Sequence, residues 1–187
     1  MANKVHMQPL IAAMVSMSIA PWNHWRIENP EINPDLSGVE LADINLSYAN
    51  LSCADLSHAD LSRTNLHHAT LQHTDLSATD LQKADLSEAD LSYAVLKGAD
   101  LRGANLQDAK LRGTYLIGAN LKDADFRGAD LTTALIAPGA IEGQKGLISG
   151  GVSQLEKLAL RLFARAKVTD HPLLDGDTKP PRFAKHI

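Results

Sequence analysis

The sequence predicts an all-β solenoid, because one five-residue phrase repeats twenty times without a break over residues 34–133. The third residue of each phrase, here called its centre, falls at every fifth position from Leu36 to Leu131. Nineteen of the twenty centres are Leu, and Phe126 is the exception. Alanine stands two residues before the centre in thirteen phrases, and Asp or Asn stands one residue before it in fifteen. Such a repeat indicates a stack of similar short units.

A period of five matches neither regular element. In an α-helix, five residues turn by about 140°, so the leucines would form no common face. In a flat strand they would alternate between opposite faces. A short side and a turn in every five residues satisfies the pattern, with Leu and Ala inside and the other three positions in water. Four sides close a coil, so the same side recurs every twenty residues, and about five coils stack at about 4.8 Å.

The phrases also resemble those of a known family. Runs of the form A(D/N)LSx and A(D/N)LRG, as in Ala84–Glu88 and Ala99–Gly103, are similar to the pentapeptide-repeat family. The resemblance implies a right-handed quadrilateral β-helix over residues 34–136, and its all-Leu, loop-free phrases look like the cyanobacterial-type members. The expected core ladder includes Leu56, Leu76, Leu96, Leu116 and Phe126.

The two halves of the repeat differ in composition. Residues 34–93 carry ten acids and two bases, whereas residues 94–133 carry five acids and six bases. Serine follows most centres up to Ser92, and Lys or Arg follows many later ones. Glycine becomes common two residues after the centre from Gly98 onward, which predicts a different turn type in the later phrases.

Residues 1–33 are expected to cap the open end of the first coil. A short helix begun near Pro9 would cover the apolar run from Leu10 to Ala20, with Trp22 and Trp25 adding apolar surface. The run is too short to span a bilayer. This interpretation places the protein in the cytoplasm. The alternative is a signal peptide over residues 1–20, which would make the protein exported or lumenal.

Residues 137–187 are predicted to form a connector, a helix at about 153–167 and an extended tail. Ser153 and Glu156 form a capping box that opens the helix. One face of this helix is apolar and another is basic. The apolar interface is Leu155, Leu158 and Leu162, and the basic stripe is Lys157, Arg161 and Arg165. The helix would cap the last coil, and the family resemblance adds a homodimer through it as a second option.

No catalytic, cofactor or metal site is expected. The sequence has no nucleophile elbow, phosphate loop, zinc signature or dinucleotide fingerprint. A spacing of twenty puts His58, His68 and His73 on three different sides, which disfavours a shared metal ion. The same spacing stacks His73 between Cys53 and Tyr93, where a histidine neighbour would favour a reactive thiolate. Chance adjacency is the simpler interpretation of that column.

One outward column is acidic, and its members are Glu40, Asp60, Asp80 and Asp100. Asx turns explain Asp or Asn at this position, but Asn would serve as well, so a recognition role stays open. We therefore expect a non-enzymatic scaffold or interaction module that binds a protein partner and not nucleic acid directly. The alternative, implied by the resemblance, is a DNA gyrase-binding protein that imitates duplex DNA and confers resistance to inhibitors or toxins. About 24 Å of B-DNA carries about fourteen charges, whereas this rod has fifteen acids and eight bases.

Overall fold

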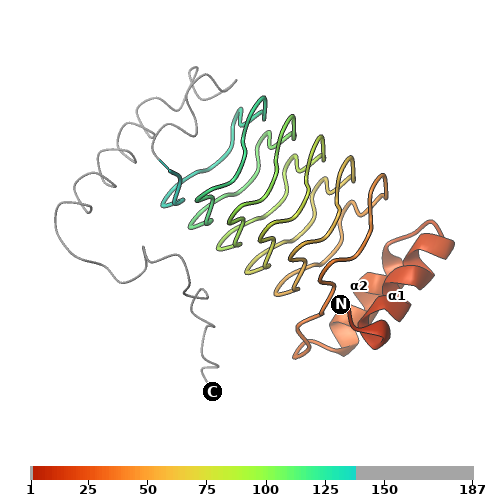
Figure 1. Ribbon diagram of the computed structural model, residues 1–187. Coiled ribbons are helices and arrows are strands. Elements are labelled where there is room, and N and C mark those ends of the chain that lie inside the picture. Colours follow the sequence, from red (N-terminus) through yellow and green to blue (C-terminus); the bar gives the residue numbers. More distant parts are fainter. Residues whose placement is uncertain (1, 138–187) are drawn as a thin grey trace.

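The computed structural model describes residues 2–137, which form two helices followed by a rod of stacked coils (Figure 1). The helices are α1 (Lys4–Val15) and α2 (Ala20–Glu28). Neither of these helices has the length and apolarity needed to cross a membrane. The predicted helix at about 153–167 and the tail lie outside the described residues.

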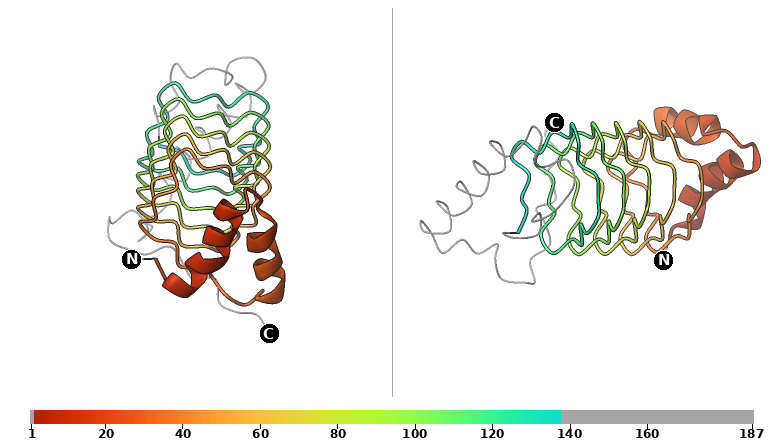
Figure 2. Two further views of the ribbon diagram at one scale, coloured as in Figure 1. Left: turned by 90° about the vertical axis from the view of Figure 1, so that its right-hand side faces the viewer. Right: turned by 90° about the horizontal axis from the view of Figure 1, so that it is seen from above.

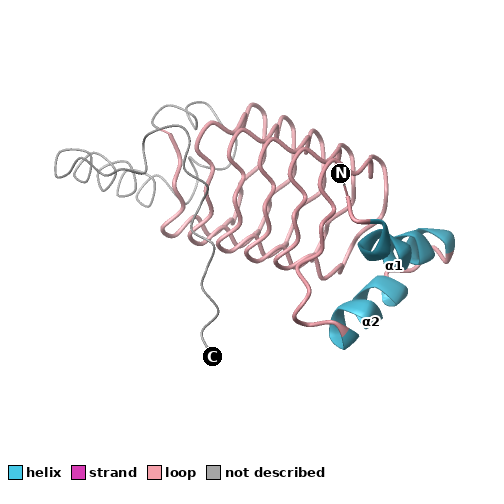
Figure 3. Ribbon diagram, turned by 60° about the horizontal axis from the view of Figure 1, so that its bottom comes forward, coloured by secondary structure: helices cyan, strands magenta, loops and turns pink. Residues whose placement is uncertain are grey.

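The coils stack with the predicted period of twenty. Parallel bridges join each residue before a centre to the residue twenty positions later, from Asp35 and Asp55 at one end to Tyr115 and Leu135 at the other. The backbone N–H of Leu36 donates to the Asp55 carbonyl at 2.8 Å, and this bond recurs along the rod. Each side contributes a single bridged residue before the chain turns, so residues 2–137 contain no extended strand (Figure 3).

All twenty turns share a positive φ at the same position. The residue two positions after the centre has a φ between 55° and 76° in every phrase, in fourteen non-glycine residues and six glycines. No residue directly after a centre is in the positive-φ region. A positive φ at only the third of the four turn residues, with a hydrogen bond from the fourth N–H to the first carbonyl, is typical of a type II turn. The prediction of a different turn type in the glycine-rich phrases is therefore wrong, because glycine here relieves strain in a turn that the stacking already requires.

The centres fill the interior of the rod. Every centre from Leu36 to Leu131 is at most 6% exposed, and all members of the predicted core ladder are buried. Threonine replaces alanine in four phrases without leaving an unpaired hydroxyl. Each threonine Oγ donates to a leucine carbonyl at 2.7–2.9 Å, and these residues are Thr64, Thr74, Thr79 and Thr114.

The two helices lie together at the N-terminal end of the rod (Figure 2). Leu10 and Trp22 are fully buried there, and the Trp22 indole N–H donates to the Asn50 carbonyl at 2.8 Å. The guanidinium of Arg26 donates to the carbonyls of Ile32 and Ser52 at 2.6 and 2.9 Å. Burial lowers the pKa of Arg26. These bonds tie α2 to the first coil.

The expectation of a short helix begun near Pro9 is wrong. Helix α1 begins at Lys4, and the Asn3 side chain caps it by accepting from the Val5 N–H at 2.9 Å. Pro9 therefore lies inside the helix. Helix α1 ends at Val15, and Met17, with a φ of 51°, lies in the connection to α2. The apolar run is divided between two helices because the chain folds back on itself over the first coil.

Candidate functional site

The predicted acidic column lies on one side of the rod, with its members joined by consecutive bridges. Its aspartate carboxylates accept hydrogen bonds from the backbone N–H groups of their own turns. Asp80 accepts from the backbone N–H and the side-chain amide of Gln82, both at 2.9 Å. Asp100 accepts from the Arg102 guanidinium, with an Nη2–Oδ2 distance of 2.7 Å. Most of these acids are therefore held by donors within their own phrase, whereas Glu40 is exposed.

Bases on the same side compensate the column. The side-chain hydrogen bond from Arg102 lowers the pKa of Asp100, and that bond also raises the pKa of Arg102. Arg63 pairs with Asp43 through two hydrogen bonds of 2.5 and 2.7 Å, which raise the pKa of Arg63 and lower that of Asp43. The column consequently does not present an uncompensated row of negative charge.

Charge is distributed over all four sides of residues 34–133. The side with the acidic column has six acids and four bases, and the next side along the chain has four acids and one base. The remaining two sides have two acids and two bases, and three acids and one base. No side of the repeat is acidic throughout.

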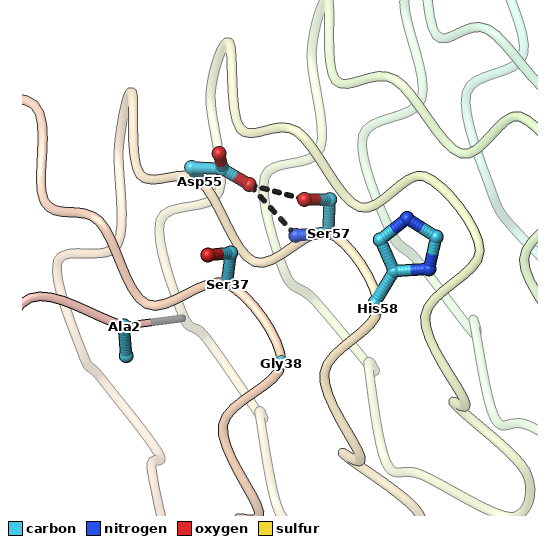
Figure 4. A pocket seen from close by; sticks show the side chains of 6 residues that line it. All are labelled: Ala2, Ser37, Gly38, Asp55, Ser57 and His58. Carbon is cyan, nitrogen blue, oxygen red and sulfur yellow. Dashed lines mark hydrogen bonds between the residues drawn. The ribbon is translucent and has the colours of Figure 1, made fainter.

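A surface hollow of about 360 Å³ lies where the chain start meets the first two coils (Figure 4). It holds Asp55, Ser57 and His58, the residue types of a hydrolase triad. The Ser57 hydroxyl, however, donates to Asp55 at 2.6 Å and points toward that carboxylate, not toward the His58 ring. The same bond joins Ser37 to Asp35 at 2.8 Å. The arrangement is therefore the turn chemistry of the repeat and not an activated nucleophile.

The column of Cys53, His73 and Tyr93 presents an aromatic surface. The rings of His73 and Tyr93 stack with centroids 5.2 Å apart and planes 6° from parallel. Cys53 is an exposed free thiol. Tyr93 also lies over Gly113, where a Cβ would come within 2.7 Å of the ring. Packing between successive coils thus accounts for His73 and Tyr93.

The structure brings together a histidine cluster that the sequence analysis missed. One potential metal-ligating atom from each of His67, His68 and Glu88 lies within 4.8 Å of the other two. The spacing among the histidines alone separates His68 from His58 and His73, because the three lie on different sides of the rod. Glu88, twenty residues after His68, was the available signal.

Helix α1 exposes an apolar surface beside its buried residues. Ile11, Met14 and Val15 are 43%, 39% and 80% exposed, and Met17 beyond the helix is 96% exposed. We call these four residues the outer apolar strip. Their spacing places the three helical members on one face of α1. Leu10 and Ala13, which contact the rest of the protein, are buried.

The predicted C-terminal interface and basic stripe lie outside the described residues and stay predictions. They comprise Leu155, Leu158, Leu162, Lys157, Arg161 and Arg165.

Comparisons with known proteins agree with the repeat. The family profile of pentapeptide repeats matches in eight copies, over residues 35–77, 71–108 and 99–135. No curated protein matches the chain.

Three solved structures of similar proteins come from cyanobacteria. Rfr23 of Cyanothece 51142 is 32% identical over 62% of this chain and 97% of its own, with a TM-score of 0.48. HetL of Nostoc sp. strain PCC 7120, described as involved in heterocyst differentiation regulation, is 34% identical over 61% and 58%, with a TM-score of 0.35. The alr5209 protein of Nostoc PCC 7120 is 34% identical over 72% and 93%, with a TM-score of 0.25.

Proposed function

Since the chain belongs to the pentapeptide-repeat family and has that family's right-handed quadrilateral β-helical fold, we propose that it is a non-enzymatic interaction module that binds a protein partner. The rod serves as a stiff support, and the helical cap at its N-terminal end supplies the contact surface. A filled rod suits this role because its shape does not depend on a bound ligand.

The outer apolar strip carries this proposal. Three of its side chains lie on one face of α1, the fourth, Met17, follows two residues after the helix ends, and all four are exposed. The core does not require them, because Leu10, Ala13 and Trp22 already close the first coil. Contiguous apolar side chains in water are typical of a protein contact surface. Burying one such side chain completely contributes about 1.5–3 kcal/mol before the costs of association.

Two other activities have less support. In the hollow beside Asp55, the Ser57 N–H and hydroxyl both donate to the Asp55 carboxylate as part of the turn, so Ser57 is not a nucleophile paired with a base. Imitation of DNA would require a continuous acidic side, whereas the fifteen acids of the repeat are spread over four sides and accompanied by eight bases. The apolar strip is the better-supported contact.

The test replaces two members of the strip with serine, in the variant Ile11→Ser/Val15→Ser. Both side chains are exposed, so the variant should keep the circular dichroism spectrum of the wild type. Ile117→Ser is the matched control, because Ile117 is also an exposed apolar residue but lies on the rod, 37% exposed. Each protein is cross-linked in cells of its source organism and its partners are quantified by mass spectrometry.

We expect a partner that wild type and Ile117→Ser capture equally and that the double variant captures at least tenfold less. Equal capture by the double variant would reject the cap as the contact surface. Light scattering during size-exclusion chromatography of the purified chain then shows whether the partner is a second copy.

A further inference from the structure

We propose that His67, His68 and Glu88 form a binding site for a divalent transition-metal ion, with Zn²⁺ as the expected occupant. Two imidazoles and one carboxylate are a ligand set that Zn²⁺ uses in proteins when a fourth position is left open. The three ligating atoms lie within 4.8 Å of one another, and His68 Nε2 lies 3.4 Å from Glu88 Oε2.

The spacing is close to that of a tetrahedral site. Zinc bonds of about 2.0–2.2 Å place neighbouring ligand atoms about 3.3–3.5 Å apart. The His68–Glu88 pair already has this separation. Bringing in the third ligand requires side-chain rotation, for which Glu88 and His68 have room because their side chains are 50% and 35% exposed. The same exposure leaves the remaining position open to water.

A hydrogen-bond chain prepares His67 for this role. His67 Nδ1 lies 3.1 Å from the Ser87 carbonyl oxygen and 2.8 Å from Ser87 Oγ. A carbonyl only accepts, so Nδ1 carries the proton and Nε2 keeps its lone pair for a metal. The Ser87 hydroxyl donates in turn to Asp85 at 2.7 Å. Metal-binding histidines commonly have such a partner on the other ring nitrogen, which fixes the tautomer and the ring orientation.

The Tyr48 ring of the preceding coil packs against both imidazoles. It stacks on His68 with a centroid separation of 5.1 Å and an angle of 25°, and it meets the His67 ring edge to face at 6.1 Å. His67 and His68 belong to one coil and Glu88 to the next. A bound ion would therefore join two coils at one edge of the rod, where the backbone of His68 has a φ of 55°.

Two variants test the site by removing one ligand each. Glu88→Gln keeps the shape of the side chain and removes the carboxylate, and His68→Asn keeps a residue that tolerates positive φ. The matched control is His58→Asn, which removes a histidine at the equivalent turn position, where φ is 60°. The full chain is purified without an affinity tag, stripped with a chelator and titrated with Zn²⁺ by calorimetry.

We expect wild type and His58→Asn to bind one ion at this site with the same affinity. Glu88→Gln and His68→Asn should each weaken that binding by at least tenfold. No binding by wild type, or equal binding by Glu88→Gln, would overturn the proposal, as would a loss in His58→Asn as large as in His68→Asn.

An independent measurement does not depend on the variants. Long-range ¹H–¹⁵N spectra of the imidazoles report which ring nitrogen is metallated. On addition of Zn²⁺, His67 should show a coordinated Nε2 and a protonated Nδ1, and Ser87→Ala should weaken binding severalfold by removing the hydroxyl partner. Zinc-induced shifts confined to other histidines would place the ion elsewhere and overturn the proposal.

Discussion

The early and late coils of the rod form the same turn from different residues. From residue 39 to 93, all eleven turns have a non-glycine residue at the position two after the centre, with φ between 55° and 63°. From residue 94 to 133, five of eight have glycine there, with φ between 67° and 76°. A left-handed conformation costs a non-glycine residue about 1–2 kcal/mol. The backbone geometry is thus imposed by stacking between coils and not by the preference of each turn residue.

The choice between glycine and a larger residue matters for packing, because the turn residue points outward at an edge of the rod. In the early coils these edges carry the rings of Tyr48, His68 and Tyr93, which stack on neighbours in the next coil or lie over it. In the later coils several glycines lie beneath a side chain of the preceding coil. A Cβ at Gly113 would meet the Tyr93 ring, and one at Gly128 would meet the Asp108 carboxylate. Glycine there accommodates both the turn and the neighbouring side chain.

Gly113→Ala should have the largest effect, because it combines both costs. Its φ of 68° disfavours a Cβ, and that Cβ would lie 2.7 Å from two atoms of the Tyr93 ring. We expect a loss of about 2 kcal/mol in the free energy of unfolding, from backbone strain of about 1 kcal/mol and a disturbed ring stack of similar size. Urea denaturation measures the loss. In a Tyr93→Ala background the same change should cost only the backbone part, and an equal loss in both backgrounds would contradict the steric explanation.

Gly98→Ala measures the cost of backbone strain without a steric clash. Gly98 has a φ of 70°, and nothing lies within 4 Å of a Cβ added there. The expected net loss is under about 1 kcal/mol, because the strain of alanine at positive φ, about 1–2 kcal/mol, is partly offset by the lower conformational freedom of the unfolded chain. Urea denaturation of Gly98→Ala and Gly113→Ala under the same conditions compares their free energies of unfolding. A free energy of unfolding equal to that of wild type would show that alanine is unstrained in this turn.

The reverse change in an early coil should stabilise the rod. Ala78 has a φ of 55° and lies in the same column as Gly98. Ala78→Gly removes the strain but increases the conformational freedom of the unfolded chain, which offsets roughly 0.4–1 kcal/mol of the gain. A net increase of a few tenths of a kcal/mol is expected. A lower midpoint of thermal unfolding than that of wild type would mean that the early turns are not strained.

The sequence was sufficient to predict the repeat and its register but not the turn. The spacing of the leucines alone defines which residues are inside and which lie twenty apart in one column. The turn conformation was missed because glycine after residue 94 was interpreted as a local change. Five glycines at one repeat position were instead evidence for the φ that Tyr48 and Ala78 also adopt. In a stacked fold, glycine at one repeat position indicates the backbone φ at the equivalent position of every phrase.

The cap depends on contacts that no periodic pattern contains, and the histidine cluster depends on which side-chain types the period places together. Helix α1 begins earlier in the chain than predicted because Asn3 caps it, and Trp22 and Arg26 hold α2 through carbonyls in the rod. The cluster required the spacing of twenty to be applied to His68 and Glu88 as an unlike pair. Its hydrogen bond from His67 to Ser87 also joins residues twenty apart. Pairs of different residue types twenty positions apart become predictable only when one asks for a particular interaction, such as metal binding or a hydrogen bond.

The smallest effect should distinguish how the two halves hold their aspartates. The Ser37 hydroxyl lowers the pKa of Asp35 in the first coil, and the Arg102 guanidinium lowers that of Asp100 in a later one. A lowered carboxyl pKa contributes stability that is present above the ordinary Asp pKa of about 3.9 and is lost as the pH falls through the lowered value. Asp35→Asn and Asp100→Asn should each cost well under 1 kcal/mol at pH 7, roughly the range of exposed pairs. Asparagine still accepts the turn N–H, which limits the loss.

Salt separates the two cases. About 1 M NaCl should reduce the cost of Asp100→Asn, because the Arg102 pair is between full charges and its arginine side chain is 48% exposed. The cost of Asp35→Asn should change less, because its main partner is the neutral Ser37 hydroxyl at 2.8 Å. Urea denaturation of wild type and both variants at low and high salt measures this, and acidification through the lowered pKa values of the two carboxyls should remove both differences. Equal salt dependence of the two variants would show that serine and arginine hold the turn aspartates in the same way.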